Sequence, residues 1–125
     1  MRVKNKEVVV KLNGQTFHCA MDITMNFIGG KWKTVVLWYL RKDKKRFTEL
    51  HKLIPQITER MLSITLKQLE ADKLIVRDVF NKKPPLKVEY SLSEFGETLI
   101  PVLNSIAKWG RELSEQKGEI IELKD

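Results

Sequence analysis

The residues best suited to chemistry in this sequence are basic and hydroxyl-bearing side chains around one helix-forming segment. Arg60, Ser63 and Lys67 lie three or four residues apart, so they share one face of a helix that Thr58 can cap. Arginine can bind guanine through two hydrogen bonds, serine can reach a base or a phosphate, and lysine can neutralise a phosphate. The pattern predicts a DNA-reading helix, although a solvated helix face has the same composition.

A second basic group lies in a segment too polar and too rich in proline to be anything but a loop. The sequence Asn81-Lys82-Lys83-Pro84-Pro85 separates two apolar segments typical of strands, and Lys87 follows it. Two lysines at a hairpin tip suit contact with a phosphate backbone or a minor groove, and a solvated turn is the alternative. The candidate DNA contacts are therefore Thr48, Gln56, Thr58, Arg60, Ser63, Lys67, Lys82, Lys83 and Lys87.

Cys19 is the one residue with a reactive thiol. A lone cysteine cannot form an internal disulfide, but it lies at a helix start, where the helix dipole favours a thiolate. The adjacent His18 can add positive charge, and the alternative is a small residue that simply packs at the helix start. A thiol enzyme is not expected, because no further base, acidic partner or cofactor fingerprint accompanies Cys19. No metal-ligand spacing occurs either, so we expect no metal and no cofactor.

The elements that must position these residues follow from hydrophobic periodicity and from capping residues. We expect Thr48, Thr58 and Ser93 to cap helices, and Pro101 to bend or restart the last one. The expected elements are a hairpin over 8–17 turning at Asn13-Gly14, helices over 21–28, 32–40, 48–54, 58–71 and 93–113, and strands over 74–80 and 86–92. This order predicts a mainly α chain with a small β-hairpin, the winged helix-turn-helix arrangement.

The last helix carries an apolar series with the heptad spacing of a helix–helix seam. We expect this seam to form a homodimer interface through Phe95, Leu99, Val102, Ile106, Trp109 and Leu113. The chain then divides into an N-terminal hairpin extension (1–18), a DNA-binding core (19–92) and a C-terminal dimerisation helix with its tail (93–125).

The overall composition fits one small domain with a polyanionic partner. The 125 residues carry a formal net charge of +7, which attracts nucleic acid or an anionic surface. No segment has the length of about 20 apolar residues that a membrane helix needs, and the N-terminus does not resemble a signal peptide. We therefore expect a cytoplasmic protein without a membrane segment.

Several motifs together resemble the HxlR-type regulators, a branch of the MarR-like winged-helix proteins. They are Ile28-Gly29-Gly30-Lys31-Trp32-Lys33, Arg46-Phe47-Thr48-Glu49-Leu50, Ile57-Thr58-Glu59-Arg60-Met61-Leu62, Val88-Glu89-Tyr90-Ser91-Leu92, and Pro101-Val102-Leu103 with Trp109-Gly110. The resemblance covers about residues 19–113 and implies a homodimer that binds an inverted-repeat operator.

The resemblance also concerns the cysteine. Family members often carry a cysteine ten residues before the first glycine of the signature, which is the position of Cys19 relative to Gly29. In some members this cysteine senses quinones, aldehydes or oxidants, so the resemblance implies a small electrophile or oxidant as a partner of Cys19. The family usually has proline next, whereas this chain has Ala20.

We therefore predict a sequence-specific DNA-binding transcriptional regulator with Cys19 as its candidate sensor. The competing hypothesis is a winged-helix protein-interaction module that does not bind DNA sequence-specifically.

Overall fold

The computed structural model describes residues 1–81 and 83–123. Lys82, one of the candidate DNA contacts, lies outside the described residues. The helices are α1 (Ala20–Ile28), α2 (Lys33–Leu40), α3 (Phe47–Leu53), α4 (Glu59–Ala71), α5 (Glu94–Glu97) and α6 (Ile100–Lys117). The strands are β1 (Arg2–Val3), β2 (Lys6–Glu7), β3 (Val10–Leu12), β4 (Gln15–Phe17), β5 (Ile75–Val79) and β6 (Val88–Leu92).

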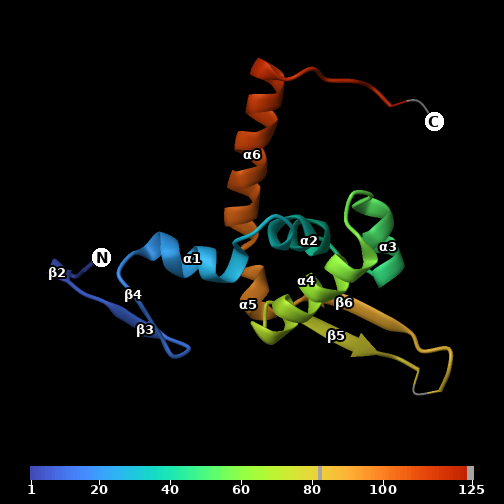
Figure 1. The fold of residues 1–125 in the computed structure, drawn as a ribbon, viewed down its shortest axis with the longest axis horizontal. Helices are drawn as coiled ribbons and strands as arrows, with labels where there is room; N and C mark the ends of the chain where they lie inside the picture. The colour runs from blue at the N-terminus through green and yellow to red at the C-terminus, as the bar shows by residue number, and fades with distance from the viewer. Residues whose placement is uncertain (82, 124–125) are drawn as a thin grey trace.

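The chain forms a winged helix-turn-helix body with two projections, as expected from the sequence (Figure 1). The body holds α2, α3, α4 and the antiparallel pair β5–β6, in which Ile75 lies opposite Leu92 and Val79 opposite Val88. The residues before α1 form an arm at the left of Figure 1, and α6 rises out of the body. Nearly all the predicted elements are present within a few residues of their expected bounds.

One hydrophobic core lies where the helices of the body meet the strands. Leu62, Leu66 and Leu69 form the predicted inward stripe of α4 and are at most 2% exposed. The other buried apolar members of this core are Ile28, Val36, Leu37, Leu40, Leu50, Ile54, Ile57, Leu74, Ile75 and Leu103. The core therefore fixes α4 against α2, leaving the opposite face of α4 to solvent.

The junction between α4 and β5 is closed by backbone hydrogen bonds. Lys73 follows α4 in the left-handed conformation, with φ 62°, and its amide donates to the carbonyl of Glu70 at 2.9 Å. The amide of Leu74 donates to the carbonyl of Leu69 at 3.0 Å, so the two bonds form a Schellman motif. This motif turns the chain directly from the recognition helix into the wing.

The predicted final helix is two helices. Ser93 caps the first, as predicted, because its Oγ accepts a hydrogen bond from the amide of Gly96 at 2.9 Å. Pro101 lies in the first turn of α6, where its missing N–H would have no helical partner. Of the two expectations for Pro101, the restart is the correct one.

The N-terminal arm contains one expected hairpin and one that the sequence did not suggest. β3 and β4 pair around Asn13 and Gly14, whose φ values of 50° and 77° are those of a tight hairpin turn. β1 and β2 form a second hairpin around Lys4 and Asn5, also at positive φ. Without glycine in that turn, its sequence carried only a weak hairpin signal.

Candidate nucleic-acid interface

The turn between α3 and α4 is held by buried apolar side chains on both sides. Ile54 and Ile57 are at most 4% exposed, and the amide of Ile57 donates to the carbonyl of Ile54 at 3.2 Å. His51 adds a contact from α3, with its Nε2 3.0 Å from the carbonyl oxygen of Ile57. Gln56 is exposed at the turn, which therefore presents its amide to solvent beside the start of α4.

The start of α4 is defined by the cap predicted from the sequence. Thr58 Oγ1 accepts a hydrogen bond from the amide of Met61 at 3.0 Å. Arg60 and Lys67 are exposed and Ser63 is half-buried, while the leucine stripe of the same helix is buried. The structure thus brings Thr58, Arg60, Ser63 and Lys67 together on one accessible helix beside the turn.

A polar hollow separates this helix from the wing. Its volume is about 390 Å³, and Ser63, Lys67 and Glu70 of α4 face Arg77 and Tyr90 of the wing across it. Arg77 was not among the residues predicted from the sequence. Its signal is the strand period of two, which places Arg77 on the same side of β5 as the buried Ile75. The hollow therefore joins a cation from the wing to the candidate reading face.

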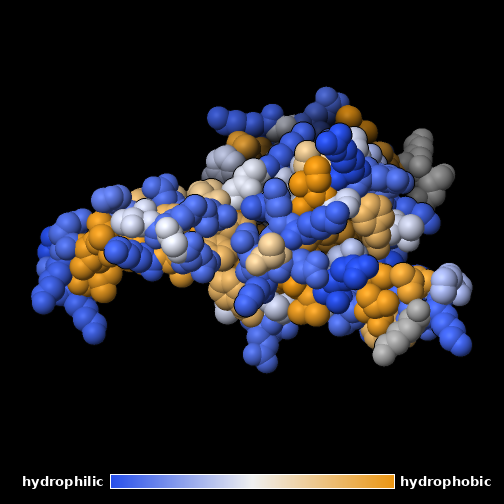
Figure 2. Space-filling view, turned by 60° about the horizontal axis from the view of Figure 1, so that its bottom comes forward, coloured by the Kyte–Doolittle hydropathy of each residue, from blue (hydrophilic) through white to orange (hydrophobic). Residues whose placement is uncertain are grey.

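The wing presents its basic residues away from the core. Lys83 and Lys87 are exposed around the loop that follows β5, and the amide of Phe80 donates to the carbonyl of Lys87 at 2.8 Å. Val79, Phe80 and Leu86 are also at least 42% exposed, so the base of the loop is apolar. Figure 2 shows orange side chains at the wing end of the molecule and on the arm, separated by a largely blue face.

Thr48 does not cap α3. The helix begins at Phe47, with Arg46 as its cap, and the Oε1 of Glu49 accepts a hydrogen bond from the amide of Arg46 at 2.9 Å. The glutamate side chain satisfies the backbone donor that the threonine was expected to satisfy. Thr48 is instead an exposed residue within the first turn, and a carboxylate already occupies the amide at the helix start.

The basic run between α2 and α3 is largely engaged within the chain. Arg41 stacks 3.5 Å from the ring centroid of Trp38, and its guanidinium donates to the Trp38 carbonyl. Lys44 Nζ lies 3.3 Å from a carboxylate oxygen of Glu89, and Lys45 pairs with Asp43. Lys45 also forms a backbone bridge with Tyr90, which fastens this segment to β6. These contacts favour a structural role for the run.

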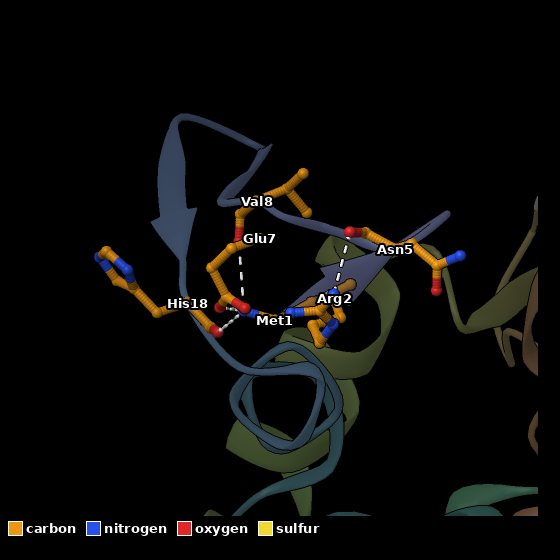
Figure 3. A network of polar contacts seen from close by, with 6 residues as sticks. All are labelled: Met1, Arg2, Asn5, Glu7, Val8 and His18. Atoms are coloured by element: carbon orange, nitrogen blue, oxygen red, sulfur yellow. Dashed lines mark hydrogen bonds and ion pairs between the residues drawn. The ribbon is translucent and has the colours of Figure 1, made fainter.

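Cys19 lies at the N-terminal cap of α1, as the sequence indicated, and is exposed. The residue before it is fixed by a network around the terminal ammonium group (Figure 3). The nitrogen of Met1 donates to the His18 carbonyl at 2.8 Å, to the Val8 carbonyl at 3.2 Å and to Glu7 Oε1 at 2.6 Å. The His18 ring points away from this network (Figure 3). The thiol is therefore accessible and follows an anchored backbone position.

The predicted dimer seam is divided between two environments. Val102, Ile106, Trp109 and Leu113 are all exposed along α6, and Trp109 reaches 67%. Phe95 lies on α5 instead, with its ring edge against Phe27 at a centroid distance of 5.6 Å. Leu99 caps α6 and packs against the core. An unpartnered apolar stripe thus runs along α6 from a base packed against the body.

Two further classes of site were checked among the residues described here. In that part of the chain no three His, Cys, Asp or Glu side chains gather as a metal site. Across the same residues, no helix has the length and hydrophobicity required to cross a membrane.

Sequence comparison identifies the family. The family model described as HxlR-like helix-turn-helix matches residues 27–118. A relative from Bacillus subtilis (strain 168), the HTH-type transcriptional regulator YdeP, is 43% identical over 115 residues, which cover 91% of this chain and 89% of YdeP. These matches include α2, α3, α4 and the wing.

Structural comparison finds redox regulators with the same fold. The redox regulator HypR in its oxidized form superposes with a TM-score of 0.71 at 44% identity, over 75% of this chain and 96% of HypR. The diamide-treated transcriptional regulator YodB from B. subtilis gives a TM-score of 0.62 at 31% identity, over 82% of this chain and 97% of YodB.

Proposed function

The chain belongs to the HxlR-like helix-turn-helix family of transcriptional regulators, and from this premise we propose that it binds an inverted-repeat DNA operator as a homodimer. It acts in the cytoplasm by binding rather than by catalysing a reaction. The observation that carries the proposal is the face of α4 that holds Arg60, Ser63 and Lys67, opposite the buried leucine stripe and beside Arg77 of the wing.

The roles of these residues follow from their positions. Arg60, in the first turn of α4, enters the major groove and reads a base edge. Thr58, Gln56 and Ser63 contact bases or phosphates around it, and Lys67 binds a phosphate one turn further along. Thr48, Lys82, Lys83 and Lys87 complete the proposed phosphate contacts.

The homodimer rests on the exposed stripe of α6. An α-helix that leaves Val102, Ile106, Trp109 and Leu113 in water at heptad spacing is typical of one half of a helix–helix interface. Pairing two such helices buries the stripes and sets two copies of α4 at a fixed separation. An inverted repeat matches that symmetry because each half-site meets one copy of α4.

The test is fluorescence anisotropy with DNA from upstream of the protein's own gene, across salt concentrations and with nonspecific competitor. We expect binding that survives competitor and weakens steeply with salt as phosphate-bound counterions return. Arg60→Ala is expected to weaken it by about 1–3 kcal/mol, the discrimination of one bidentate base contact. Arg111→Ala removes the same charge from the side of α6 opposite the apolar stripe and serves as the control.

Absence of competitor-resistant binding there leads to selection from random DNA sequences. If the selection enriches no sequence and Arg60→Ala has no effect, the protein is a winged-helix interaction module and the proposal is wrong.

Cys19 is the proposed sensor within this function. The thiol is exposed, and the titles of the structural neighbours describe an oxidized HypR and a diamide-treated YodB. Since the chain has one cysteine, a disulfide needs the other subunit's Cys19 or a small thiol. Two thiols lose two protons and two electrons, diamide accepts them as it is reduced to the hydrazine, and one S–S bond forms. The bond would alter the base of α1 and thereby the spacing of the two α4 helices.

Cys19→Ser separates this step from DNA binding. The variant is expected to keep the DNA affinity of the reduced protein and to lose its response to diamide. A non-reducing gel distinguishes an intersubunit disulfide from a mixed disulfide with a small thiol. A serine variant whose DNA binding still responds to diamide would falsify the sensing role.

A further inference from the structure

The largest apolar hollow of the described residues lies away from the candidate DNA face. It has a volume of about 490 Å³, and its walls come from the β3–β4 turn, α1, the α4–β5 junction, α5 and the residues that precede α6. The apolar lining residues are Leu12, Ile23, Phe27, Leu74, Phe95 and Leu99. Cavities of about 300–1,000 Å³ with mainly apolar walls and a few polar groups are typical of small-molecule sites.

The aromatic side chains give the cavity a defined wall. Phe27 and Phe95 meet edge to face, with an interplanar angle of 79°, so their rings stand nearly perpendicular. Phe95 is 47% exposed although it is in contact with Phe27. Such a pair offers both a ring face and a ring edge to an aromatic guest.

Polar groups lie at the ends of the cavity's walls, and a cation is the most accessible of them. Lys73 and Asn13 are exposed lining residues, and the structure records no hydrogen bond or ion pair for either side chain among the described residues. Asp72 is half-buried beside Lys73. An anionic head can therefore pair with the Lys73 ammonium and accept a hydrogen bond from the Asn13 amide while its rings contact the apolar wall.

The proposed dimer stripe is largely separate from this cavity. Phe95 and Leu99 line it, whereas Val102, Ile106, Trp109 and Leu113 do not. A partner helix that covers the exposed stripe of α6 does not need to occupy the space between the β3–β4 turn and α1. The cavity is thus a candidate site of its own.

We propose that this cavity binds a small aromatic molecule with an anionic head group. The rings contact Phe27, Phe95 and the neighbouring aliphatic side chains, and the head group lies at Lys73. The site is independent of Cys19 and of the DNA-reading face, so it goes beyond the proposed function. Its binding is measured without DNA, which keeps its failure distinct from a failure of operator recognition.

The test uses two dyes that share their ring systems and differ in charge. Anilinonaphthalene sulfonate is anionic, N-phenylnaphthylamine is its neutral counterpart, and both fluoresce in apolar sites. We expect saturable binding of the sulfonate at one molecule per chain. Lys73→Asn is expected to weaken the sulfonate by about threefold, as for a solvent-exposed ion pair, and to leave the neutral dye unchanged. Asparagine suits this variant because it tolerates the positive φ at position 73.

A matched pair of variants on α1 locates the site. Thr24→Phe places a ring in the cavity, because Thr24 is a lining residue, and is expected to abolish binding of both dyes. Asn26→Phe adds the same ring at an exposed position of α1 outside the lining and is expected to bind as the unmodified protein does. Circular dichroism confirms that both variants are folded, and the charge variant provides an independent test if Thr24→Phe is not.

Three results would overturn the proposal. The first is dye binding that does not saturate at one molecule per chain. The second is a sulfonate affinity that does not change in Lys73→Asn, or a folded Thr24→Phe that still binds. The third is binding that disappears as sedimentation velocity shows the dimer forming, which would mean that a second copy covers the cavity.

Discussion

Gly96 occupies a position in the structure where a single methyl group has a large calculable effect. A Cβ at Gly96 would overlap the carbonyl oxygen of Leu74 and lie 3.1 Å from its carbonyl carbon. The obstacle is backbone, so α5 or the start of β5 must move. That movement stretches two hydrogen bonds of Ser93, from its amide to the Leu74 carbonyl at 3.1 Å and from its Oγ to the Lys73 carbonyl at 2.6 Å. Gly96→Ala therefore loosens the clamp between the end of α4 and α5.

The expected loss of unfolding free energy follows from these contacts. Overpacking of a closed site costs about 1–3 kcal/mol, and each hydrogen bond contributes about 1 kcal/mol. Gly96→Ala is therefore expected to lower the free energy of unfolding by about 2–4 kcal/mol. With an m-value of about 2 kcal/mol/M, the urea midpoint falls by about 1–2 M.

Gly110→Ala is the matched control for this measurement. A Cβ at Gly110, within α6, meets nothing within 4 Å, so the same substitution removes only the conformational freedom of glycine in a helix. It should raise the free energy of unfolding by about 0.5–1 kcal/mol. Both variants are unfolded in urea at one chain concentration, because dimerisation makes stability depend on it. A Gly96→Ala midpoint within error of the unmodified protein would refute the close approach of α5 to β5.

Three further predictions concern caps, assembly and the wing. Thr58→Ala removes the cap of α4 and should cost about 1 kcal/mol in urea unfolding, whereas Thr48→Ala should cost less than about 0.5 kcal/mol, and equal losses would contradict the cap assignment. Ile106→Asp places a charge on the exposed stripe of α6 and should shift sedimentation toward monomer, while Arg111→Asp on the opposite side should not. Arg77→Ala should weaken DNA binding at all sequences alike and reduce the salt slope by about one, and a loss confined to one DNA sequence would indicate base reading instead.

The parts of the fold that the sequence predicted are those determined by local spacing. Thr58 before the leucine stripe and Ser93 before Gly96 each specified a helix start, because a capping side chain reaches an amide only three residues away. Thr48 misled because the same motif holds a better solution. Glu49 reaches back to the Arg46 amide and starts α3 earlier, so two capping arrangements compete within four residues.

The features that the sequence did not predict depend on contacts between distant segments. Arg77 approaches Lys67 only because β5 pairs with β6 beside α4. The division of the last helix at Leu99 follows from the packing of Phe95 against Phe27, about 68 positions earlier in the chain by their numbering. Helical spacing remains regular across that division, which is why the apolar series read as one continuous seam.

The α4–β5–α5 junction explains how a change at the dimer base can reach the DNA-reading helix. The Schellman motif at Lys73 ends α4, and the next carbonyl, that of Leu74, accepts a hydrogen bond from Ser93 at the start of α5. Gly96 then lets α5 lie directly against that carbonyl, so no flexible side chain separates the two segments. Because close-packed backbone transmits a displacement rather than absorbing it, a rotation of α6 on its base moves the C-terminal end of α4. The spacing of two α4 helices on an operator is then set by how two copies of α6 pair, and a disulfide or a ligand near α1 acts on that spacing through the same junction.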